Sequence, residues 1–462
     1  MNIRKKLKAV KEYALSNLNR SDSTLKILEN KIENKVYIER IVKKNKVRNL
    51  VDSYEYVRSN GEISILPLTL DTAEKIVERI RTSNMSYNAC FVFHENESED
   101  FKELDWVKTE KEHKYTSTGI KFWRHQQQML EFRKPFDGSA RNTVVSTHIS
   151  PEGKCNLKCP YCSVTYRDTH SRISLERIKE YVNDLSLRGL KAVILTGGGE
   201  PTLYPHFNEL VQWIKFEKGL SVALITNGTL IERRVDPLTL SCFSWIRVSI
   251  NVFTGWENKI KLPTEHLDSN CIVGCSFVWT SEHESTEFDT SDRYDLLKKI
   301  AKVADNVGAQ YVRVLPNCLL EQKQLVEQHV SLNRVLENFN DQRFFQQYKV
   351  HGAPECNTCH QSYFRPYLSE EAFEDGEPGT VYPCDSVVLN ESVTHFAKKY
   401  QLCKPENVLD YMDGKIKHKF NASKDCGGCV FTDNVNMLND WKENGRNKFD
   451  EFNERIMHEE FV

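Results

Sequence analysis

Long apolar runs are absent from this 462-residue chain. Nowhere do eighteen apolar residues follow one another, which predicts that no helix spans a membrane. The first twenty residues are basic and contain no apolar block of the kind found in a secretory signal. The formal net charge is also small, at −2. We therefore expect a cytoplasmic protein that does not associate with membranes.

Cysteine, by contrast, is abundant, with fourteen residues. Secreted disulfide scaffolds are usually short, and thiols in the cytosol stay reduced. A chain of this length is therefore not expected to use its cysteines for disulfides. Several of them are clustered, and clustered cysteines in an intracellular protein indicate metal ligands.

Residues 1–140 are expected to form an α+β region of unknown fold, with a possible role in recognising the substrate or a partner. Apolar residues at helical spacing between lysine and glutamate, among them Ile27, Leu28 and Ile41, predict helices over residues 1–50. The other elements expected here are a hairpin over 54–66, a helix over 70–82 and a strand over 89–93.

In residues 141–340, short apolar strands alternate with amphipathic helices, which is the pattern of βα units around a parallel sheet. Six strands are expected, at residues 144–149, 192–196, 222–226, 246–250, 272–279 and 311–315, with helices at 174–187, 206–217 and 294–307. The repeat predicts an α/β fold, a partial (β/α)6 barrel of the TIM type. In such barrels the chemistry lies in the loops at the carboxyl ends of the strands.

A third region, residues 341–435, is rich in cysteine. Its cysteines are Cys356, Cys359, Cys384, Cys403, Cys426 and Cys429. Two strands, 363–368 and 380–382, are expected to form a hairpin around a turn that contains glycine and proline. Residues 436–462 are charged and amphipathic and are expected to form a helical tail.

Three cysteines, Cys155, Cys159 and Cys162, follow directly after the first expected strand of the barrel. We call residues 155–162 the cysteine loop. A closed structural zinc site takes four ligands, and an iron–sulfur cubane has four irons to ligate. Three thiols on one short loop would leave one iron free to bind another molecule, so the spacing indicates a reactive loop. The alternative is a zinc loop with a distant fourth ligand.

A glycine turn, residues 197–201 (Gly-Gly-Gly-Glu-Pro), follows the second strand. Glycines let the backbone approach a ligand closely, and the carboxylate of Glu200 can accept hydrogen bonds from an ammonium group. Taken alone, the segment could also be an ordinary tight turn. The same holds for Thr-Asn-Gly at 226–228, which ends the third strand, because Asn-Gly is a common turn pair.

Polar residues alternate along the fourth strand. Arg247, Ser249 and Asn251 fall on one face of it, and polar residues on the inner face of a barrel strand indicate contact with a ligand. Arg313 is an equivalent inward charge on the sixth strand. For Arg313 a structural ion pair and a contact with the substrate are both open.

The cysteine loop, with the aromatic Tyr161 before its last cysteine, resembles that of the radical S-adenosylmethionine (SAM) enzymes. The resemblance covers residues 140–435 or so. It implies that Cys155, Cys159 and Cys162 hold a [4Fe–4S] cluster whose free iron chelates SAM. In that family an electron from the cluster splits SAM and releases a 5′-deoxyadenosyl radical, which removes a hydrogen atom from the substrate.

The resemblance also implies how SAM is held. The family has a Gly-Gly-Glu motif that binds the amino group of SAM, a similar Thr-Asn-Gly near the SAM pocket, and polar strand residues that contact its ribose and carboxylate. The cofactor-binding residues expected from these matches are Tyr161, Gly198, Gly199, Glu200, Asn227, Ser249 and Asn251. No catalytic acid or base is predicted.

The cysteines of the third region resemble those of the twitch domain, a shortened form of the SPASM domain of radical SAM enzymes. This resemblance implies one auxiliary [4Fe–4S] cluster with four ligands, Cys359, Cys384, Cys426 and Cys429. Cys356 could replace Cys359, and Cys403 is a weaker substitute. A zinc ribbon with the same four thiols is the alternative. The remaining cysteines have no ligand spacing and are expected to be small buried side chains; Cys318, just after the sixth strand, is the exception worth testing.

The resemblance implies a reducing partner such as a flavodoxin or ferredoxin, and an oxidative outcome, dehydrogenation or a crosslink. The expected substrate is a ribosomally made peptide or protein. A nucleotide or nucleic acid is the second choice, because residues 1–50 hold fourteen Lys/Arg against five Asp/Glu, and a small carbohydrate-like metabolite is the third. A non-enzymatic iron–sulfur sensor or scaffold is the alternative of another class.

Overall fold

The computed structural model divides the chain into two compact units, residues 1–108 and 109–462. In the first unit it describes the strands at 24–30, 35–42, 45–58, 63–67 and 89–95. In the second it describes residues 110–462 apart from 166, 252–255, 281–289, 350–351, 390–397 and 450–455. Among all these residues, no helix combines the length and the apolar character needed to cross a membrane.

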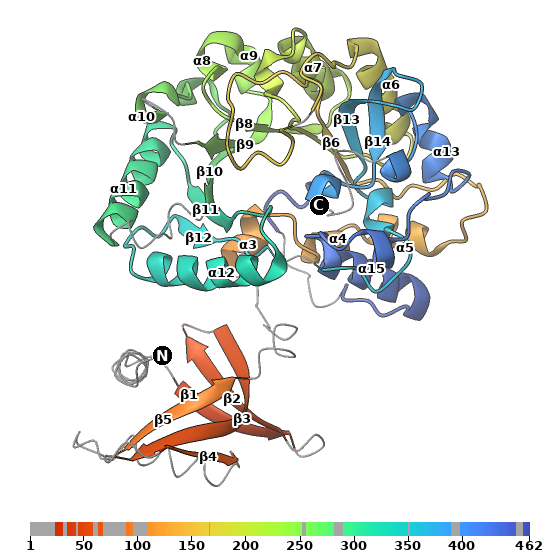
Figure 1. Ribbon diagram of the computed structural model, residues 1–462. Coiled ribbons are helices and arrows are strands. Elements are labelled where there is room, and N and C mark those ends of the chain that lie inside the picture. The colour runs from red at the N-terminus through yellow and green to blue at the C-terminus, as the bar shows by residue number, and fades with distance from the viewer. Residues whose placement is uncertain are drawn as a thin grey trace. The chain divides into compact units, whose positions relative to one another are not determined.

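The first unit contains an antiparallel sheet (Figure 1). Its strands are β1 (Thr24–Asn30), β2 (Lys35–Val42), β3 (Asn45–Arg58), β4 (Ile63–Pro67) and β5 (Ala89–Glu95). β3 pairs with β2 through its first half and with both β4 and β5 through its second half. The predicted hairpin and the strand at residue 89 are confirmed. The predicted helix at 70–82 lies outside the described residues.

The helices predicted for residues 1–50 are wrong where the structure describes this segment, because β1, β2 and the start of β3 occupy it. The apolar residues of β2 are mainly β-branched valine and isoleucine, which favour a strand over a helix. The many lysines and glutamates fit either structure, so the local pattern did not decide between them.

The second unit is built on a nine-stranded sheet with the order β12-β11-β10-β9-β8-β7-β6-β13-β14. Seven strands are parallel to one another: β6 (Ser146–Ile149), β7 (Ala192–Leu195), β8 (Ser221–Thr226), β9 (Phe243–Ile250), β10 (Ile272–Trp279), β11 (Tyr311–Pro316) and β12 (Phe344–Gln346). The first six are the strands predicted from the sequence, so the partial (β/α)6 barrel is confirmed. The short edge strand β12 was not predicted.

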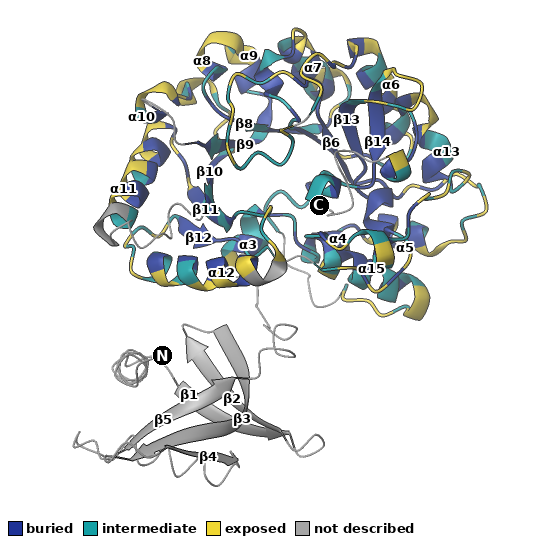
Figure 2. Ribbon diagram, in the orientation of Figure 1, coloured by how far each residue is buried: buried dark blue, intermediate teal, exposed yellow. Residues whose placement is uncertain are grey.

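The described helices of the second unit are α3 (Glu110–Tyr115), α4 (Ile120–Trp123), α5 (Gln126–Arg133), α6 (Leu175–Ser186), α7 (Phe207–Gln212), α8 (Ile231–Arg234), α9 (Pro237–Leu240), α10 (Trp256–Lys259), α11 (Thr290–Asn306), α12 (Gln322–Glu337), α13 (Val408–Met412), α14 (Ala422–Asp425) and α15 (Thr432–Asn444). Helices α6 to α12 connect these strands and cover the outside of the sheet, whereas α3 to α5 precede β6 and α13 to α15 follow β14 (Figures 1 and 2). A π-helical turn, Trp213–Glu217, extends α7.

Helix α6 illustrates how local sequence sets these elements. Ser174 caps it by accepting a hydrogen bond from the backbone N–H of Arg177. Ile178, Tyr181 and Leu185 follow at helical spacing and are all buried against the sheet. The sequence predicted a helix at 174–187, and the structure has it at Leu175–Ser186.

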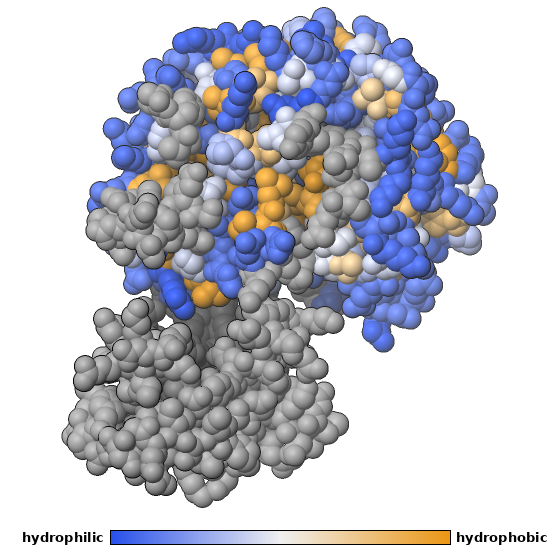
Figure 3. Space-filling model, viewed as in Figure 1, coloured by the Kyte–Doolittle hydropathy of each residue, from blue (hydrophilic) through white to orange (hydrophobic). Residues whose placement is uncertain are grey.

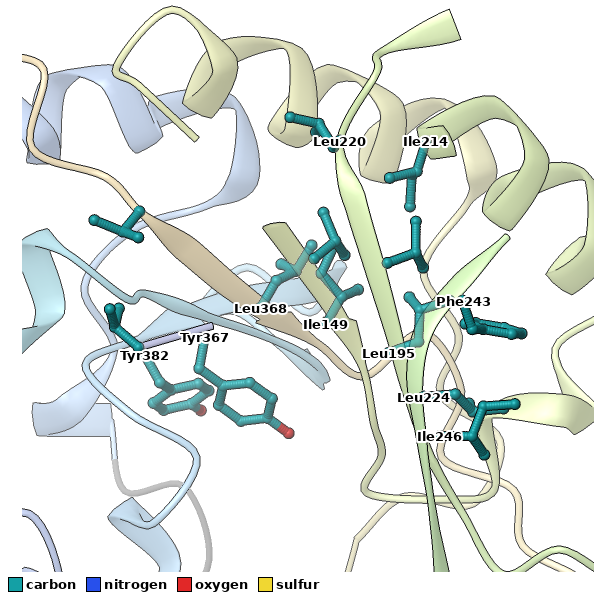
Figure 4. Packing of buried hydrophobic residues seen from close by; sticks show 14 of the residues in the cluster. Ile149, Leu195, Ile214, Leu220, Leu224, Phe243, Ile246, Tyr367, Leu368 and Tyr382 are labelled. Carbon is teal, nitrogen blue, oxygen red and sulfur yellow. The ribbon is translucent and has the colours of Figure 1, made fainter. Parts of the chain in front are cut away.

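The hairpin of the third region, β13 (Tyr367–Ala372) and β14 (Pro378–Tyr382), extends the sheet of the barrel. β13 pairs in parallel with β6, and Leu368 lies opposite Ile149. Both of these side chains are fully buried and lie close together in the core (Figure 4). The cysteine-rich segment is therefore joined to the first barrel strand by a continuous hydrogen-bonded ladder.

The tail predicted at 436–462 is helical only at its start. Helix α15 ends at Asn444, and Gly445 follows with φ +70°, the left-handed conformation that commonly terminates a helix. The described residues 456–462 form turns and extended backbone. Phe461 packs on the inner face of the barrel with Ala192, Ala223 and Trp245.

Most of the face of the second unit in Figure 3 is hydrophilic, with hydrophobic residues gathered toward its middle. Large apolar side chains that remain exposed are scattered over separate elements, for example Leu130 on α5 and Leu238 on α9. Isolated exposed apolar residues of this kind are normal for a protein surface.

Candidate functional site

The cysteine loop begins six residues after β6, at the carboxyl end of the barrel strands. Its three thiols are half-buried and carry no disulfide. Burial and then the neighbouring thiols Cys162 and Cys155 raise the pKa of Cys159 to about 11. Burial likewise raises the pKa of Cys155. These mutual effects show that the three sulfur atoms lie near one another, as the sequence spacing predicted.

Arg167 contacts the loop and was not predicted as a site residue. Its Nη1 lies 3.6 Å from Sγ of Cys162, and its Nε donates to the carbonyl of Gly153 at 2.7 Å. A guanidinium can donate a hydrogen bond to a cysteine sulfur, so Arg167 is placed to orient this part of the loop. Arg167 follows Cys162 by five residues, but no spacing rule marks it.

The glycine turn runs directly beside the segment that leads into the cysteine loop. The backbone N–H of Gly199 donates to the carbonyl of Glu152 at 3.0 Å, and that of Glu200 donates to Lys154 at 2.8 Å. A Cβ on Gly199 would lie 2.2 Å from the carbonyl oxygen of Lys154, so only glycine allows this approach. The predicted Gly-Gly-Glu motif and the cysteine loop are thus brought together.

The carboxylate of Glu200 is buried and fully engaged by the protein. Its Oε1 accepts hydrogen bonds from the N–H and hydroxyl of Thr202 and from the hydroxyl of Thr226, at 2.7–3.1 Å. Its Oε2 accepts from the backbone N–H of Asn227 at 2.8 Å. A carboxylate offers about four acceptor positions. Glu200 therefore ties the glycine turn to the end of β8.

Two side-chain contacts connect the cysteine loop to neighbouring strand ends. The Nδ2 of Asn227, after β8, donates to Oδ1 of Asn156 at 2.9 Å. The hydroxyl of Tyr161 donates to Oδ1 of Asn251, after β9. Asn251 also donates to the backbone carbonyl of Ser249. The predicted cofactor-binding residues thus form one connected group at the carboxyl ends of the strands.

Glu370, on β13, reaches the same place from the third region and was missed by the sequence analysis. It is fully buried, and its Oε1 has no hydrogen-bond partner among the described residues. A Cβ on Gly198 would lie 1.8 Å from this oxygen, so the carboxyl group faces the glycine turn. Burial raises the pKa of Glu370 to about 7.

The four predicted auxiliary ligands are also brought together. Burial, then the charges of Cys429 and Cys426, raise the pKa of Cys359. Burial, then Cys359 and Cys429, raise that of Cys384 well above its ordinary value. Four thiols from three separate segments therefore lie in one neighbourhood, although they do not converge on a single metal position among the described residues.

Cys356 lies at the edge of this group. Besides burial, the charge of Cys356 raises the pKa of Cys359, and the charge of Cys429 raises the pKa of Cys356. Its Sγ donates to the carbonyl of Thr358 at 3.2 Å. Cys403 lies elsewhere: its backbone bridges to Val381, and the charges that act on its thiol are those of carboxylates. Of the two substitutes considered, Cys356 is therefore in place and Cys403 is not.

The donor sets suit iron–sulfur clusters in their chemistry. Both groups consist of soft thiols, the ligands that iron–sulfur clusters use, and the first has three while the second has at least four. Within the described part of the chain, no three Cys, His, Asp or Glu side chains already converge on one metal position. The thiols are thus neighbours that have to turn toward a bound group.

The two inward arginines have different surroundings. Arg247 donates to the hydroxyl of Tyr311 and to the carbonyl of Tyr115, both at 3.1 Å, and borders a small pocket of about 40 Å³ at the amino ends of the strands. Arg313 donates to Oε1 of Gln347 at 2.6 Å. Among the described residues, neither arginine forms an ion pair with a carboxylate. An ion pair was one of the two interpretations of Arg313, and the described residues do not supply it.

Known proteins match part of this chain. Residues 149–264 match the Radical SAM superfamily. Curated relatives include the Fe-coproporphyrin III synthase of Methanosarcina barkeri, 39% identical over 111 residues (23% of this chain and 27% of the relative). Another is the GTP 3′,8-cyclase of a Synechocystis strain, 36% identical over 112 residues (24% and 34%). The chain spans well under half the length of these relatives.

Among solved structures, Streptococcus suis SuiB bound to the precursor peptide SuiA is similar in fold. The match covers 84% of this chain and 88% of the SuiB chain, at 12% identity and a TM-score of 0.39. The family match begins at Ile149, the last residue of β6, and includes the cysteine loop and the glycine turn. Members of this superfamily use a [4Fe–4S] cluster and SAM. Residues 149–264 of this chain are therefore similar to the Radical SAM superfamily.

Proposed function

We propose that the protein is a radical SAM enzyme that oxidatively modifies its substrate. The observation that carries the proposal is the packing of the glycine turn on the segment before the cysteine loop, through the backbone bonds of Gly199 and Glu200. This packing supports a three-thiol group beside half-buried turn backbone. A sensor without SAM would need the thiols but not the glycines.

In this proposal Cys155, Cys159 and Cys162 hold a [4Fe–4S] cluster, and Arg167 orients this part of the loop through its contact with Cys162. When bound, such a cluster supplies the electron that splits SAM into methionine and a 5′-deoxyadenosyl radical, which removes a hydrogen atom from the substrate. The tether from Tyr161 to Asn251 holds the loop against the barrel.

The amino group of SAM would be received by the glycine turn together with Glu370. Gly198 and Gly199 leave the space, and Glu200 orients the turn because both its oxygens are already engaged. Glu370 is the buried carboxyl group with an unused oxygen at Gly198. An ammonium group there would gain a charge-assisted hydrogen bond. Asn227, Ser249 and Asn251 would contact the rest of the molecule.

The second thiol group would hold an auxiliary [4Fe–4S] cluster with Cys359, Cys384, Cys426 and Cys429 as ligands. Mutual electrostatic effects among the four thiols support the grouping. An electron acceptor near the substrate suits an oxidative outcome, in which the substrate loses one hydrogen atom, one electron and one proton in total to form a new double bond or crosslink. A zinc site with the same thiols is the alternative.

The proposed substrate is a ribosomally made peptide or protein, as twitch-bearing enzymes often act on these. A nucleotide is the second candidate, and the specific observation in its favour is the relatedness of residues near 149–264 to enzymes named for nucleotide substrates. The basic segment 1–50 leaves a nucleic acid open as well. The chemistry calls for a low-potential donor such as a flavodoxin or ferredoxin, and the proposed location is the cytoplasm.

Removal of one loop thiol tests the enzyme proposal. Cys159→Ala is expected to reduce the release of 5′-deoxyadenosine to background in an anaerobic assay with SAM and dithionite, because the loop would then offer only two thiolates. Cys242→Ala, at a buried cysteine without thiol neighbours, serves as the control and should retain the activity. Release of 5′-deoxyadenosine by Cys159→Ala at the level of the unaltered protein would refute the proposal.

The role of Glu370 predicts a pH-dependent affinity for SAM. Below its pKa of about 7 the carboxyl group of Glu370 is mostly protonated, and it must lose this proton before it can accept a charge-assisted hydrogen bond from the amino group of SAM. The Kd of SAM should therefore fall about tenfold from pH 6 to pH 8. Glu370→Gln should bind SAM about tenfold more weakly at pH 8 and lose this dependence. Calorimetric titration measures both. An unchanged affinity in the variant would exclude this contact.

Metal analysis tests the auxiliary group. Anaerobically reconstituted protein is expected to contain about eight irons per chain, and Cys384→Ser about four, because one cluster would be lost. About four irons and one zinc in the unaltered protein would instead support the zinc alternative. Loss of the second set of irons in Cys356→Ser, but not in Cys359→Ser, would show that Cys356 is the ligand.

A further inference from the structure

The inner face of the barrel carries an arginine, Arg313, that forms no ion pair with a described residue. Arg313 lies on β11 opposite Ser276 of β10, which in turn lies opposite Ser249 of β9. Its Nη1 is bound to the neutral amide of Gln347, and its buried Nε has no hydrogen-bond partner among the described residues. One edge of the guanidinium fork is therefore unused.

A second cation, Lys349, lies near Arg313 just after β12. The charge of Arg313 acts on the side chain of Lys349. Within the described residues the contact of its Nζ is with the ring of Phe431, 5.1 Å from the centroid, and no carboxylate lies within ion-pair distance. Burial, and then Arg247, lower the pKa of Arg313 to about 9. Burial lowers that of Lys349 to about 8, although the charges of Cys318 and Asp385 act in the opposite direction.

The carboxylate in this part of the barrel is already committed. Asp385 lies 3.0 Å from Nη2 of Arg365 through Oδ1 and 3.3 Å from Nδ1 of His148 through Oδ2. Burial would raise its pKa, but the charges of His148 and Arg365 hold that pKa well below its usual range. The charge of Asp385 also acts on Arg313 and Lys349, but its two oxygens contact Arg365 and His148. One carboxylate thus serves several basic side chains, and positive charge remains in excess.

We infer that Arg313 and Lys349 bind an oxyanion, a carboxylate or phosphate group, of the substrate. This inference rests on the proposed function, because it assigns the barrel interior to the substrate. A guanidinium fork with a free edge suits the two oxygens of such a group, and a nearby ammonium adds a second charge. Both residues retain some exposed surface, while the unpartnered Nε of Arg313 is itself buried. The substrate is therefore acidic at the point that enters the barrel.

The competing explanation is that Arg313 and Lys349 neutralise the negative charge of the cysteine group in the third region. This explanation accounts for Lys349 only. Lys349 acts on Cys429, so thiolates there would compensate part of its charge. The one thiol that acts on Arg313 is Cys318, which has no cysteine neighbour of its own. Arg313 thus needs another anion.

An uncompensated arginine has a measurable cost in the ligand-free protein. Buried like charges repel and lose hydration, so replacement by a neutral side chain of similar shape should relieve the strain. Arg313→Gln is therefore expected to raise the melting temperature of the ligand-free protein while it weakens anion binding. An arginine that served only to hold the fold would show the opposite change in stability.

The test uses the anaerobic, cluster-loaded full chain with four probes: inorganic phosphate, GTP, and a short amidated peptide that contains one glutamate or, in its twin, one glutamine. At least one oxyanion probe should raise the melting temperature of the unaltered protein and bind about ten- to hundredfold more weakly to Arg313→Gln and Lys349→Met. Arg334→Gln, at an exposed arginine on α12, is the matched control and should bind as the unaltered protein does. Phosphate and GTP would indicate a nucleotide source, and the glutamate peptide an acidic peptide.

Any one of three results would overturn the inference. The first is that no oxyanion probe binds, and the second is that Arg313→Gln binds the probes as tightly as the unaltered protein does. The third is that the glutamate and glutamine peptides bind equally and neither phosphate nor GTP has an effect. Binding needs no SAM cleavage, so the two proposals can fail separately. Release of 5′-deoxyadenosine without anion binding would refute this inference alone. Anion binding without SAM cleavage would refute the proposed reaction and leave the anion site standing.

Discussion

The site depends on one close contact between two backbone segments, the glycine turn and the residues that lead from β6 into the cysteine loop. Two backbone hydrogen bonds, from Gly199 to Glu152 and from Glu200 to Lys154, hold them in register. A side chain at Gly199 would collide with both carbonyls, so the contact exists only because glycine is there. It puts thiols beside a half-buried turn, and the proposed SAM chemistry follows from that arrangement.

A second connection brings the third region to the same barrel. Because β13 pairs with β6, Glu370 reaches Gly198, and Asp385, next to Cys384, reaches His148 on β6. The barrel strands and the cysteine-rich segment therefore share one interior. That interior is rich in cations, which connects the proposed auxiliary group to an acidic substrate.

Much of this could be predicted from local sequence. The three-cysteine spacing, the glycine turn and the alternation of strands and helices gave the barrel and the grouping of thiols, since each is a pattern within a few residues. Glu370 could not be found this way, because only strand pairing brings it to Gly198 across 172 positions of sequence. The strands at residues 24–58 were missed because their lysines and glutamates fit helices equally well, and pairing between strands decides the outcome.

The central claim is that the cysteine loop holds a cluster with one iron open to SAM. Electron paramagnetic resonance of the anaerobically reduced full chain, recorded before and after addition of SAM, tests it most directly. The account predicts a [4Fe–4S]⁺ signal whose g values change when SAM is added. The absence of such a signal, or a signal that SAM leaves unaltered, would contradict it.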